Sequence, residues 1–339
     1  MAELLVVDNL SVDFPTEDGV VHAVRGVSFT LNEGEILGIV GESGSGKSVS
    51  SLAIMGLLPR TARITGSIRY RGEEIVGRRP SEMRDIRGKE IAMIFQDPMT
   101  SLNPVYTVGW QLSEAVRAHQ QVSKAKARER AVEMLDLVGI PQARQRADAY
   151  PHEYSGGMRQ RAMIAMAMVN DPDVLIADEP TTALDVTVQA QILETLVRIK
   201  EQTNAAIMLI THDLGVVAGM VTKMQVMYAG TVVESGTVDE VFYRPRMPYT
   251  VGLLGSIPSV DSSGGRLHPI KGAPPSLINL PAGCPFSPRC PLVSDACLES
   301  EPFIGSTDTD THRAACFHWE QLSTYEDPRV LFAEGGVTR

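Results

Sequence analysis

The stretch EILGIVGESGSGKS, residues 35–48, decides the fold of this chain. Its first six residues form a short apolar run of the kind that becomes a buried strand. The next eight match the pattern G-x-x-x-x-G-K-[ST], and a helical pattern follows to Leu58, just before Pro59. Glycines let such a loop turn its backbone N–H groups toward phosphate oxygens at the positive end of the helix. The stretch therefore predicts a phosphate-binding loop (P-loop) between a strand and a helix.

Two side chains of this loop have predicted chemical roles. We expect Lys47 to reach the β and γ phosphates of a nucleotide and Ser48 to bind Mg²⁺. The other loop residues that we assign to the nucleotide site are Gly41, Ser43, Gly44, Ser45 and Gly46. A glycine-rich turn without a ligand is the alternative, and the context of strand, loop and helix argues against it.

A second chemical element ends the apolar run VLIADE, residues 174–179. Asp178 suits the carboxylate that holds Mg²⁺ beside a P-loop, and Glu179 could orient and deprotonate an attacking water. Acids at the end of a strand are common at protein surfaces, so the element is weak by itself. After a P-loop it predicts a site for nucleotide hydrolysis.

The composition limits the partners of the chain. Its 339 residues include 31 Lys and Arg against 41 Asp and Glu, a formal net charge of −10. This balance argues against a nucleic-acid-binding surface, which needs clustered basic residues. No apolar run approaches the roughly 18 residues of a membrane span. The N-terminus, MAELLVVDNL, lacks the basic segment of a signal peptide, so we expect a cytosolic protein.

Further apolar runs at 91–95, 174–178 and 206–211 also predict buried strands. Helical patterns at 111–138 and 155–169 separate them. This alternation is typical of an α/β architecture with a largely parallel sheet. The N-terminal stretch and residues 223–236 instead predict antiparallel strands, the latter turning near Ala229 and Gly230.

Residues 244–288 are dense in proline and glycine, which predicts an irregular extension. We therefore expect a nucleotide-binding domain at 1–243 and a C-terminal extension at 244–339. Thiols stay reduced in the cytosol, so a cysteine cluster in the extension predicts a metal site that staples it. On their spacing alone, zinc and an iron–sulfur cluster are equally compatible. The cysteines are Cys284, Cys290, Cys297 and Cys316.

The P-loop and four further motifs together resemble those of ABC-type ATPases in order and spacing. The segment YSGGMRQR, residues 154–161, is similar to the signature motif of that family. Independently of the resemblance, its serine is suited to cap a helix whose exposed amides would hold an anion. The other resemblances are to the Q-loop, D-loop and switch histidine. The matching residues are Gln96 in IFQDP, Ser155, Gly156 and Gly157 of the signature, Asp185 in ALD (183–185), and His212 in ITHD.

The resemblance implies the fold of an ABC-type P-loop ATPase. This fold has a RecA-like α/β core, an antiparallel β subdomain and a helical subdomain at about 97–170, here followed by the irregular cysteine-rich extension. ATP and Mg²⁺ are the implied cofactors, with each ATP held between the P-loop of one subunit and the signature of a second. Glu179, His212 and Gln96 would be catalytic, Asp185 would complete the nucleotide site, and Phe14 would stack on adenine.

The extension narrows the resemblance further. The segments RPRMPYTVGLLGSIP (244–258) and FQDPMTSLNP (95–104) are similar to ATP-binding subunits of dipeptide, oligopeptide and nickel importers, although Met247 stands where those usually have histidine. The segment CPFSPRC (284–290) is similar to importer tails, some of which carry a 4Fe-4S cluster, and this favours iron–sulfur over zinc.

The resemblance also implies partners and a location. The chain would be the ATP-hydrolysing motor at the cytoplasmic face of the cell membrane, bound to two transmembrane permease subunits. A second ATPase subunit, a homologue, would complete the dimer, and an extracytoplasmic substrate-binding protein would act indirectly. No nucleic acid partner is expected.

A soluble ABC ATPase of DNA repair or translation is the alternative function. Such proteins generally carry two ATPase units or a long coiled-coil insertion, together with basic surfaces. This chain has one unit and an acidic balance. A P-loop kinase acting on a small acceptor would leave the signature, Q-loop and D-loop elements unexplained.

Overall fold

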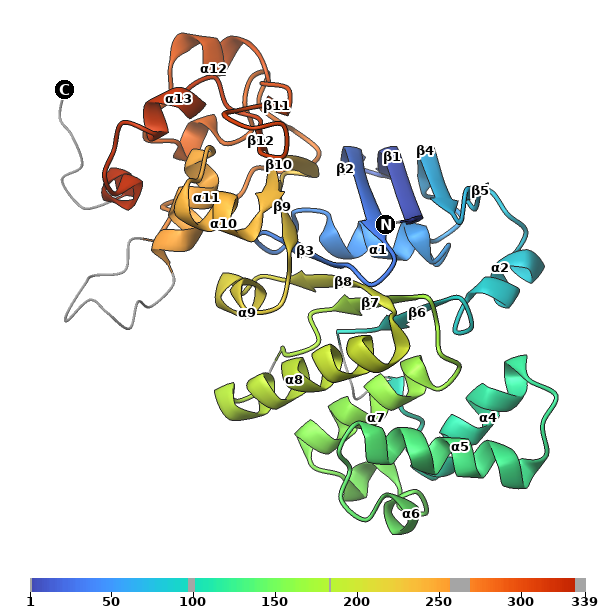
Figure 1. The fold of residues 1–339 in the computed structure, drawn as a ribbon. Coiled ribbons are helices and arrows are strands. Elements are labelled where there is room, and N and C mark those ends of the chain that lie inside the picture. Colours follow the sequence, from blue (N-terminus) through green and yellow to red (C-terminus); the bar gives the residue numbers. More distant parts are fainter. Residues whose placement is uncertain (1, 97–100, 183, 257–268, 333–339) are drawn as a thin grey trace.

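The computed structural model describes residues 2–96, 101–182, 184–256 and 269–332, and its fold is shown in Figure 1. Parts of three sequence patterns lie outside the described residues. These parts are 97–100 of FQDPMTSLNP, Ala183 of the ALD motif and 257–258 of the importer-like segment.

Two sheets organise the described part of the chain. A four-stranded antiparallel sheet has the order β2-β1-β4-β5, and an eight-stranded sheet has the order β11-β12-β10-β9-β3-β8-β7-β6. The strands are β1 (Glu3–Thr16), β2 (Gly19–Asn32), β3 (Ile36–Val40), β4 (Arg63–Tyr70), β5 (Glu73–Glu74), β6 (Ile91–Ile94), β7 (Val174–Asp178), β8 (Ala206–Thr211), β9 (Lys223–Tyr228), β10 (Thr231–Thr237), β11 (Gly305–Ser306) and β12 (Arg313–Ala314).

Helices cover the larger sheet and extend from it. The α-helices are α1 (Lys47–Ile54), α2 (Pro80–Ile86), α4 (Val108–His119), α5 (Lys124–Leu137), α6 (Ala143–Arg146), α7 (Gly156–Met168), α8 (Val186–Thr203), α9 (Leu214–Ala218), α10 (Val238–Tyr243), α11 (Pro248–Gly255), α12 (Asp295–Glu299) and α13 (Trp319–Leu322). Short 3₁₀ turns are η1 (Pro151–Glu153), η2 (Ser287–Arg289) and η3 (Pro328–Phe332).

The parallel part of the larger sheet positions the P-loop. Strands β9, β3, β8, β7 and β6 are parallel neighbours in that order. The four apolar runs predicted as buried strands are β3, β6, β7 and β8, so these predictions are confirmed. Because parallel strands end at the same edge, the loops after β3, β7 and β8 meet there, where ligands bind in open α/β sheets.

Both faces of this parallel part are buried. On β3, Ile36 and Val40 pack into the core beneath the helices, whereas Leu37 and Ile39 pack toward the antiparallel sheet. Apolar residues therefore occupy consecutive positions along the strand, as expected for a strand covered on both sides. The continuous apolar runs in the sequence have this physical origin.

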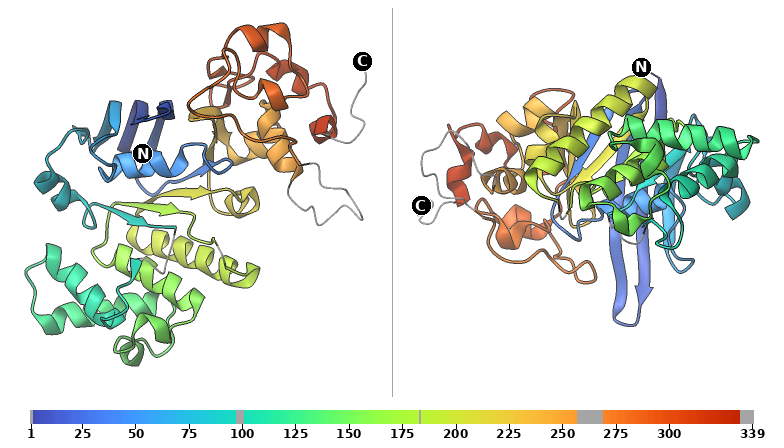
Figure 2. Two further views of the ribbon diagram at one scale, coloured as in Figure 1. Left: turned by 180° about the vertical axis from the view of Figure 1, so that it is seen from behind. Right: turned by 90° about the horizontal axis from the view of Figure 1, so that it is seen from below.

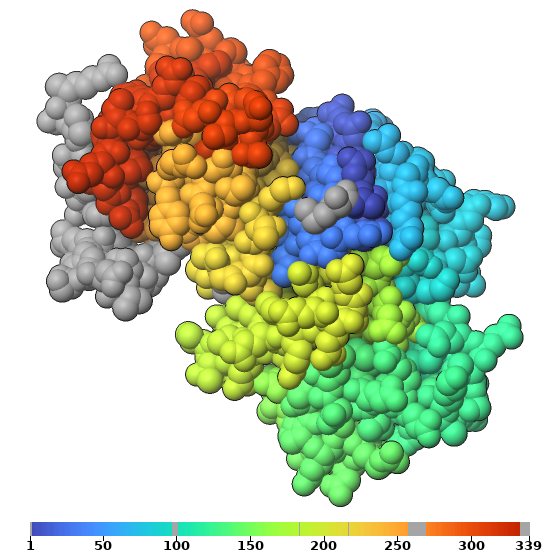
Figure 3. All heavy atoms as spheres, viewed as in Figure 1, coloured from blue at the N-terminus to red at the C-terminus, as the bar shows by residue number. Residues whose placement is uncertain are grey.

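The helical lobe, α4 to α7, lies at one end of the molecule, away from the C-terminal extension (Figures 1 and 3). The single helix predicted at 111–138 is wrong, because α4 and α5 are separate helices. Gln120 has an extended backbone that ends α4, and the Ser123 side chain accepts the N–H of Lys126 to begin α5. The predicted helix at 155–169 is confirmed as α7.

Helix α1 ends sooner than the sequence pattern predicts. The pattern predicts a helix that reaches Leu58, whereas α1 stops at Ile54. Gly56 adopts φ 60°, the left-handed conformation that commonly ends a helix. The proline at 59 therefore follows the end of the helix and does not cause it.

The C-terminal extension packs on the β9–β10 side of the core (Figures 1 and 2). It contains more regular structure than its composition predicts, since α11 lies within it and β12 pairs with β10 through Glu234 and Ala314. An ion pair between Arg25 and Glu301 also joins the two parts. The extension therefore continues the core sheet. No helix in the described part of the chain is long and apolar enough to cross a bilayer.

Candidate functional site

The P-loop lies between β3 and α1. At two of its glycines, another segment of backbone lies too close to leave room for a side chain. A Cβ on Gly41 would lie 2.2 Å from the Met227 carbonyl oxygen, and one on Gly46 would lie 2.4 Å from the Ala23 carbonyl oxygen. Both glycines have positive φ values, 155° and 99°. Only glycine fits at these two positions, because a side chain would collide with backbone.

Lys47 is the first residue of α1, and its side chain is buried. Its Nζ donates to the carbonyl oxygens of Gly41, at 2.8 Å, and Glu42, at 2.9 Å. Burial lowers the pKa of the Lys47 ammonium, and the charges of Glu179, Asp178 and Glu42 oppose that effect. The ammonium is thus held by backbone oxygens at the place where the motif predicts contact with phosphates.

Ser48 and Asp178 bring the two predicted Mg²⁺ ligands together across 130 positions of sequence. The Ser48 hydroxyl donates to Asp178 Oδ1 at 3.0 Å. Burial raises the pKa of the Asp178 carboxyl, and the charge of Glu179 adds to this, whereas the Ser48 hydrogen bond and Lys47 act in the opposite direction. An adjacent hydroxyl and carboxylate form an oxygen donor set of the kind that Mg²⁺ prefers, so these residues fit the predicted ion.

Glu179 is the meeting point of three sequence motifs. Its Oε2 accepts hydrogen bonds from Gln96 Nε2 at 3.0 Å and from the Thr182 hydroxyl at 2.7 Å. Its Oε1 lies 3.4 Å from His212 Nδ1. Glu179 also has a left-handed backbone, φ 48°, which costs a non-glycine residue about 1 kcal/mol or more and is typical of functional sites. Glu179 therefore contacts both of the other predicted catalytic residues.

The signature residues lie in a different place from the P-loop. Ser155 caps α7 by accepting the Met158 N–H at 3.3 Å, and Asp185 caps α8 by accepting the Val188 N–H at 3.0 Å. With Gly156 and Gly157 they line a cavity of about 410 Å³. None of the described residues that line this cavity belongs to the P-loop. The predicted nucleotide contacts thus form two separate half-sites on one chain.

The structure places Phe14 on β1, opposite Val21 of β2. Its side chain is half-buried against the core that lies under the antiparallel sheet. Nothing in this position tests adenine stacking, which stays a prediction.

The four cysteines converge, although they span 33 positions of sequence. All four are free thiols and line one small cavity with apolar neighbours that include Met247, Phe286 and Phe317. The Cys290 sulfur accepts the Leu292 N–H, and the Cys316 sulfur accepts the His318 N–H. Burial raises the pKa of both thiols to about 12.

The predicted metal at these cysteines is not confirmed. Among the described residues, no group of three or more His, Cys, Asp or Glu side chains is arranged to hold a metal ion. The side chains of Cys284 and Cys297 are buried in the apolar core, and those of Cys290 and Cys316 are partly buried against it. Four thiols around one cavity give the number of ligands that a metal centre needs, but their side chains also pack as part of the apolar core.

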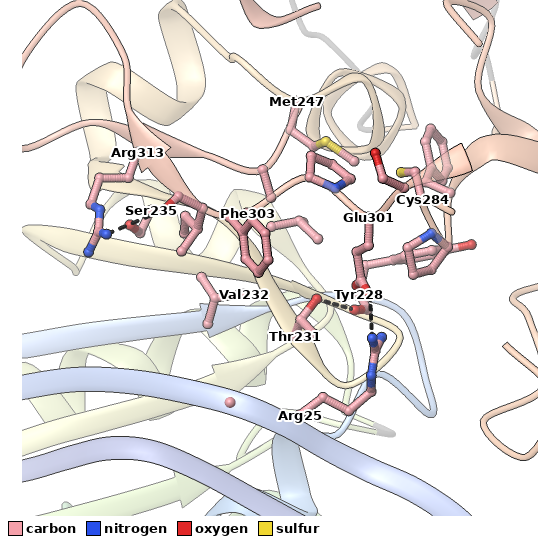
Figure 4. Close-up of a pocket in the computed structure, with 18 of the residues that line it drawn as sticks. Arg25, Tyr228, Thr231, Val232, Ser235, Met247, Cys284, Glu301, Phe303 and Arg313 are labelled. Atoms are coloured by element: carbon pink, nitrogen blue, oxygen red, sulfur yellow. Dashed lines mark hydrogen bonds and ion pairs between the residues drawn. The ribbon is translucent and has the colours of Figure 1, made fainter. Parts of the chain in front are cut away.

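Two larger cavities lie away from the P-loop. One, of about 720 Å³, is lined by residues of β2, β10 and the extension, among them the paired Arg25 and Glu301 (Figure 4). The other, of about 550 Å³, lies between the core and the helical lobe, and its lining includes Phe95, the residue before Gln96. Its lining is rich in apolar side chains, among them Leu57, Phe95, Met163 and Met166. We refer to this second cavity as the lobe groove.

Several functional contacts were not predicted from the sequence. Thr182 binds the same carboxylate oxygen as Gln96. Its place three residues after Glu179, in a turn that follows the strand, was the available signal. Glu42, in the second position of the P-loop, contacts Tyr249 and Arg289 of the extension. No sequence pattern indicates such contacts.

The fold and this site define a class of protein, the ABC-type P-loop ATPase. Comparison with protein families agrees: residues 24–182 match the ABC transporter family, and residues 233–297 match the C-terminal region of oligopeptide/dipeptide transporters. The chain belongs to the ABC transporter family, in the group of oligopeptide and dipeptide transport ATP-binding proteins.

Individual relatives align over nearly the whole chain. It is 53% identical to the dipeptide transport ATP-binding protein DppD of Bacillus subtilis, over 96% of this chain and 97% of that one. It is 52% identical to the oligopeptide transport ATP-binding protein OppD of Escherichia coli, over 93% of each. It is 56% identical to OppD of Mycobacterium tuberculosis over 95% of this chain, but it spans only 53% of that protein's length.

Solved structures share the core fold. The dimeric post-hydrolysis state of the ATP-binding cassette MJ0796 bound to ADP and Pi is 26% identical, with a TM-score of 0.63 over 69% of this chain and 99% of that one. The structure of cbiO1 from Clostridium perfringens is 28% identical, with a TM-score of 0.61 over 72% and 92% of the two chains.

We predict that Glu179→Gln binds ATP with the parent affinity but hydrolyses it at least about 100-fold more slowly, because the amide keeps its hydrogen bonds but cannot accept a proton. Nucleotide binding and phosphate release measure the two effects. Lys47→Ala is the matched control, which we expect to lose most ATP binding. Normal turnover by the Glu179→Gln protein would remove Glu179 from the role of general base.

Proposed function

We propose that this chain is the ATP-hydrolysing subunit of a membrane importer for peptides. The observation that carries the proposal is the contact of Gln96 and His212 with Glu179, beside the Ser48–Asp178 pair of the P-loop. The transported class follows the printed names of the relatives, which are dipeptide and oligopeptide transport proteins. In this proposal, residues 1–243 bind nucleotide and residues 244–339 form an importer-type extension.

The proposed mechanism assigns one task to each contact. The backbone amides of Gly41 to Ser48 and the ammonium of Lys47 bind the phosphates of ATP. Ser48 and Asp178 would hold Mg²⁺, which neutralises charge on the β and γ phosphates when bound. Glu179 orients the attacking water and accepts its proton, while Gln96 and His212 hold the carboxylate in position. Phe14 would stack on adenine.

The separation of the two half-sites supports a head-to-tail dimer. An ATP held on the P-loop of one subunit would receive Ser155, Gly156, Gly157 and Asp185 from the other subunit. The exposed N-terminus of α7 suits the γ-phosphate, because unpaired amides and the helix dipole favour an anion there. MJ0796 forms a dimer in its ADP-bound structure. We propose that the second subunit here is a homologous ATPase.

The lobe groove supports docking to a membrane protein. Leu57 and Phe95 are about 40% exposed in it, and an apolar patch of this kind favours a protein partner over water. Phe95 in its lining is followed by Gln96, which contacts Glu179, so a partner in the groove would be coupled to the catalytic carboxylate. We propose that the cytoplasmic segments of two transmembrane permease subunits dock there. The chain would then lie at the cytoplasmic face of the membrane, with an extracytoplasmic binding protein delivering the peptide.

The soluble ABC ATPase is the weaker alternative. It explains the P-loop, the signature and the Glu179 cluster equally well. It does not explain the match of residues 233–297 to the oligopeptide/dipeptide transporter C-terminal region. It also gives no role to the apolar lobe groove.

We predict that the tagged chain, gently solubilised from its native membrane, co-purifies with two transmembrane subunits and a second ATPase subunit. Leu57→Glu should lose the transmembrane subunits, because a carboxylate in the groove opposes an apolar partner. Leu298→Glu, at an exposed position of α12 in the extension, is the control and should retain them. Recovery of the chain alone, or with soluble partners only, would contradict the importer proposal.

We propose further that the four cysteines of the extension bind a four-iron, four-sulfide cluster. Four free thiols around one apolar cavity give the ligand number that such a cluster requires, and backbone N–H bonds to two of the sulfurs are a common feature of these sites. The cluster would staple the extension. Zinc is the alternative, because it also binds four thiolates.

We predict that protein purified without air is brown and contains about four iron atoms and four labile sulfides per chain. Cys290→Ser should lose the colour and expose residues from about 270 onward to protease. Colourless protein with one zinc per chain would show that the four cysteines bind zinc and not an iron–sulfur cluster. Colourless, metal-free protein with a protease-resistant extension would show that the thiols are core residues only.

A further inference from the structure

The P-loop carries an acidic residue, Glu42, directly after Gly41. Its side chain is 27% exposed and belongs to the loop that receives the phosphates. A carboxylate in the loop that is proposed to bind a triphosphate would repel it, because both groups are negative. The loop therefore needs something that cancels this charge.

Arg289 of the extension meets this carboxylate with both arms of its guanidinium. Nη1 lies 2.7 Å from Glu42 Oε2, and Nη2 lies 2.8 Å from Oε1. The Arg289 side chain is only 4% exposed. A guanidinium stays protonated in proteins, so Arg289 meets the carboxylate as a cation. Two-armed pairs of this kind are the strongest and most directional ion pairs in proteins.

Other contacts fix the orientation of Arg289. Its Nε donates to the Lys271 carbonyl oxygen at 3.2 Å, and Nη1 donates to the Tyr228 hydroxyl at 3.3 Å. The guanidinium also lies 5.8 Å from the ring centre of Tyr228 and 5.9 Å from that of Phe286. The arginine thus meets Glu42 in a preformed geometry.

The backbone of Glu42 is held as well. Its N–H donates to the hydroxyl of Tyr249 at 2.8 Å, and its carbonyl oxygen accepts from Lys47 Nζ at 2.9 Å. Tyr249 is fully buried, with its ring centre 4.5 Å from that of Tyr228. The extension therefore contacts the second residue of the P-loop at both its side chain and its backbone.

We propose that Arg289 is a positioning residue of the nucleotide site, which neutralises Glu42 so that the P-loop presents a net positive surface to the triphosphate. The inference deepens the proposed function and rests on ATP binding to the P-loop. It makes the extension a part of the ATP site. Arg289 need not touch ATP, since it acts through Glu42.

Charge neutralisation can be distinguished from a purely structural tie. If Arg289 only holds the loop in place, removing Glu42 as well does not help ATP to bind. If it cancels charge, removing the Glu42 carboxylate relieves the repulsion. The two accounts therefore predict opposite outcomes for a double variant, and they differ in salt dependence, because ions screen a charge effect.

The test measures the Kd for ATP by the fluorescence of a labelled nucleotide on the full chain. Arg289→Ala should raise the Kd roughly tenfold at low salt, as expected for an uncompensated charge near the phosphates, and less at high salt. Arg289→Ala combined with Glu42→Gln should return to within about threefold of the parent. Arg289→Lys, which keeps the charge without the fork, should stay close to the parent.

Three controls separate the possible failures. Glu301→Gln breaks a different ion pair between core and extension, the one with Arg25, and should leave the Kd unchanged. Lys47→Ala should bind poorly, and parent-like binding by it would contradict the P-loop function itself. If Arg289→Ala does not fold, the double variant still decides, because it leaves no unpaired charge. A double variant with weakened binding, or a single variant with unchanged binding, would overturn the proposal.

Discussion

A buried lysine ammonium is the feature on which the rest of the site depends. Lys47 is 4% exposed, and a charge in such a place costs several kcal/mol unless partners compensate it. Here the partners are two P-loop carbonyl oxygens, with the carboxylates of Glu179, Asp178 and Glu42 close enough to favour the charged form. The order of the parallel strands makes this possible, because β3 and β7 flank β8 and end at the same edge.

The C-terminal extension participates in the same charge balance. Arg289 lies 247 positions after Glu42, yet the two form one ion pair, and β12 continues the core sheet through β10. An ion pair and a strand pairing therefore cross the boundary that the composition predicts at residue 244. The cysteine next to Arg289, Cys290, belongs to the thiol cluster. Because Cys290 directly follows Arg289 in the chain, we expect the position of the arginine to depend on the state of those thiols.

Some of this could be predicted from sequence, and the reasons are physical. Strands β3, β6, β7 and β8 are buried on both faces, so they appear as continuous apolar runs. The P-loop could be predicted because the backbone amides that bind the phosphates are consecutive in the sequence. The break between α4 and α5 contains no glycine or proline, and it depends on the cap at Ser123. The contacts of Glu42 are set by tertiary packing alone, so no pattern of spacing reveals them.

The most direct test of the account is peptide transport by the reconstituted complex. The chain, its co-purified membrane subunits and the binding protein would be placed in vesicles with labelled peptide on the binding-protein side and ATP on the side of this chain. We expect peptide to accumulate on the ATP side, in proportion to the ATP hydrolysed. Steady ATP hydrolysis with no peptide movement, for every peptide that the binding protein holds, would contradict it.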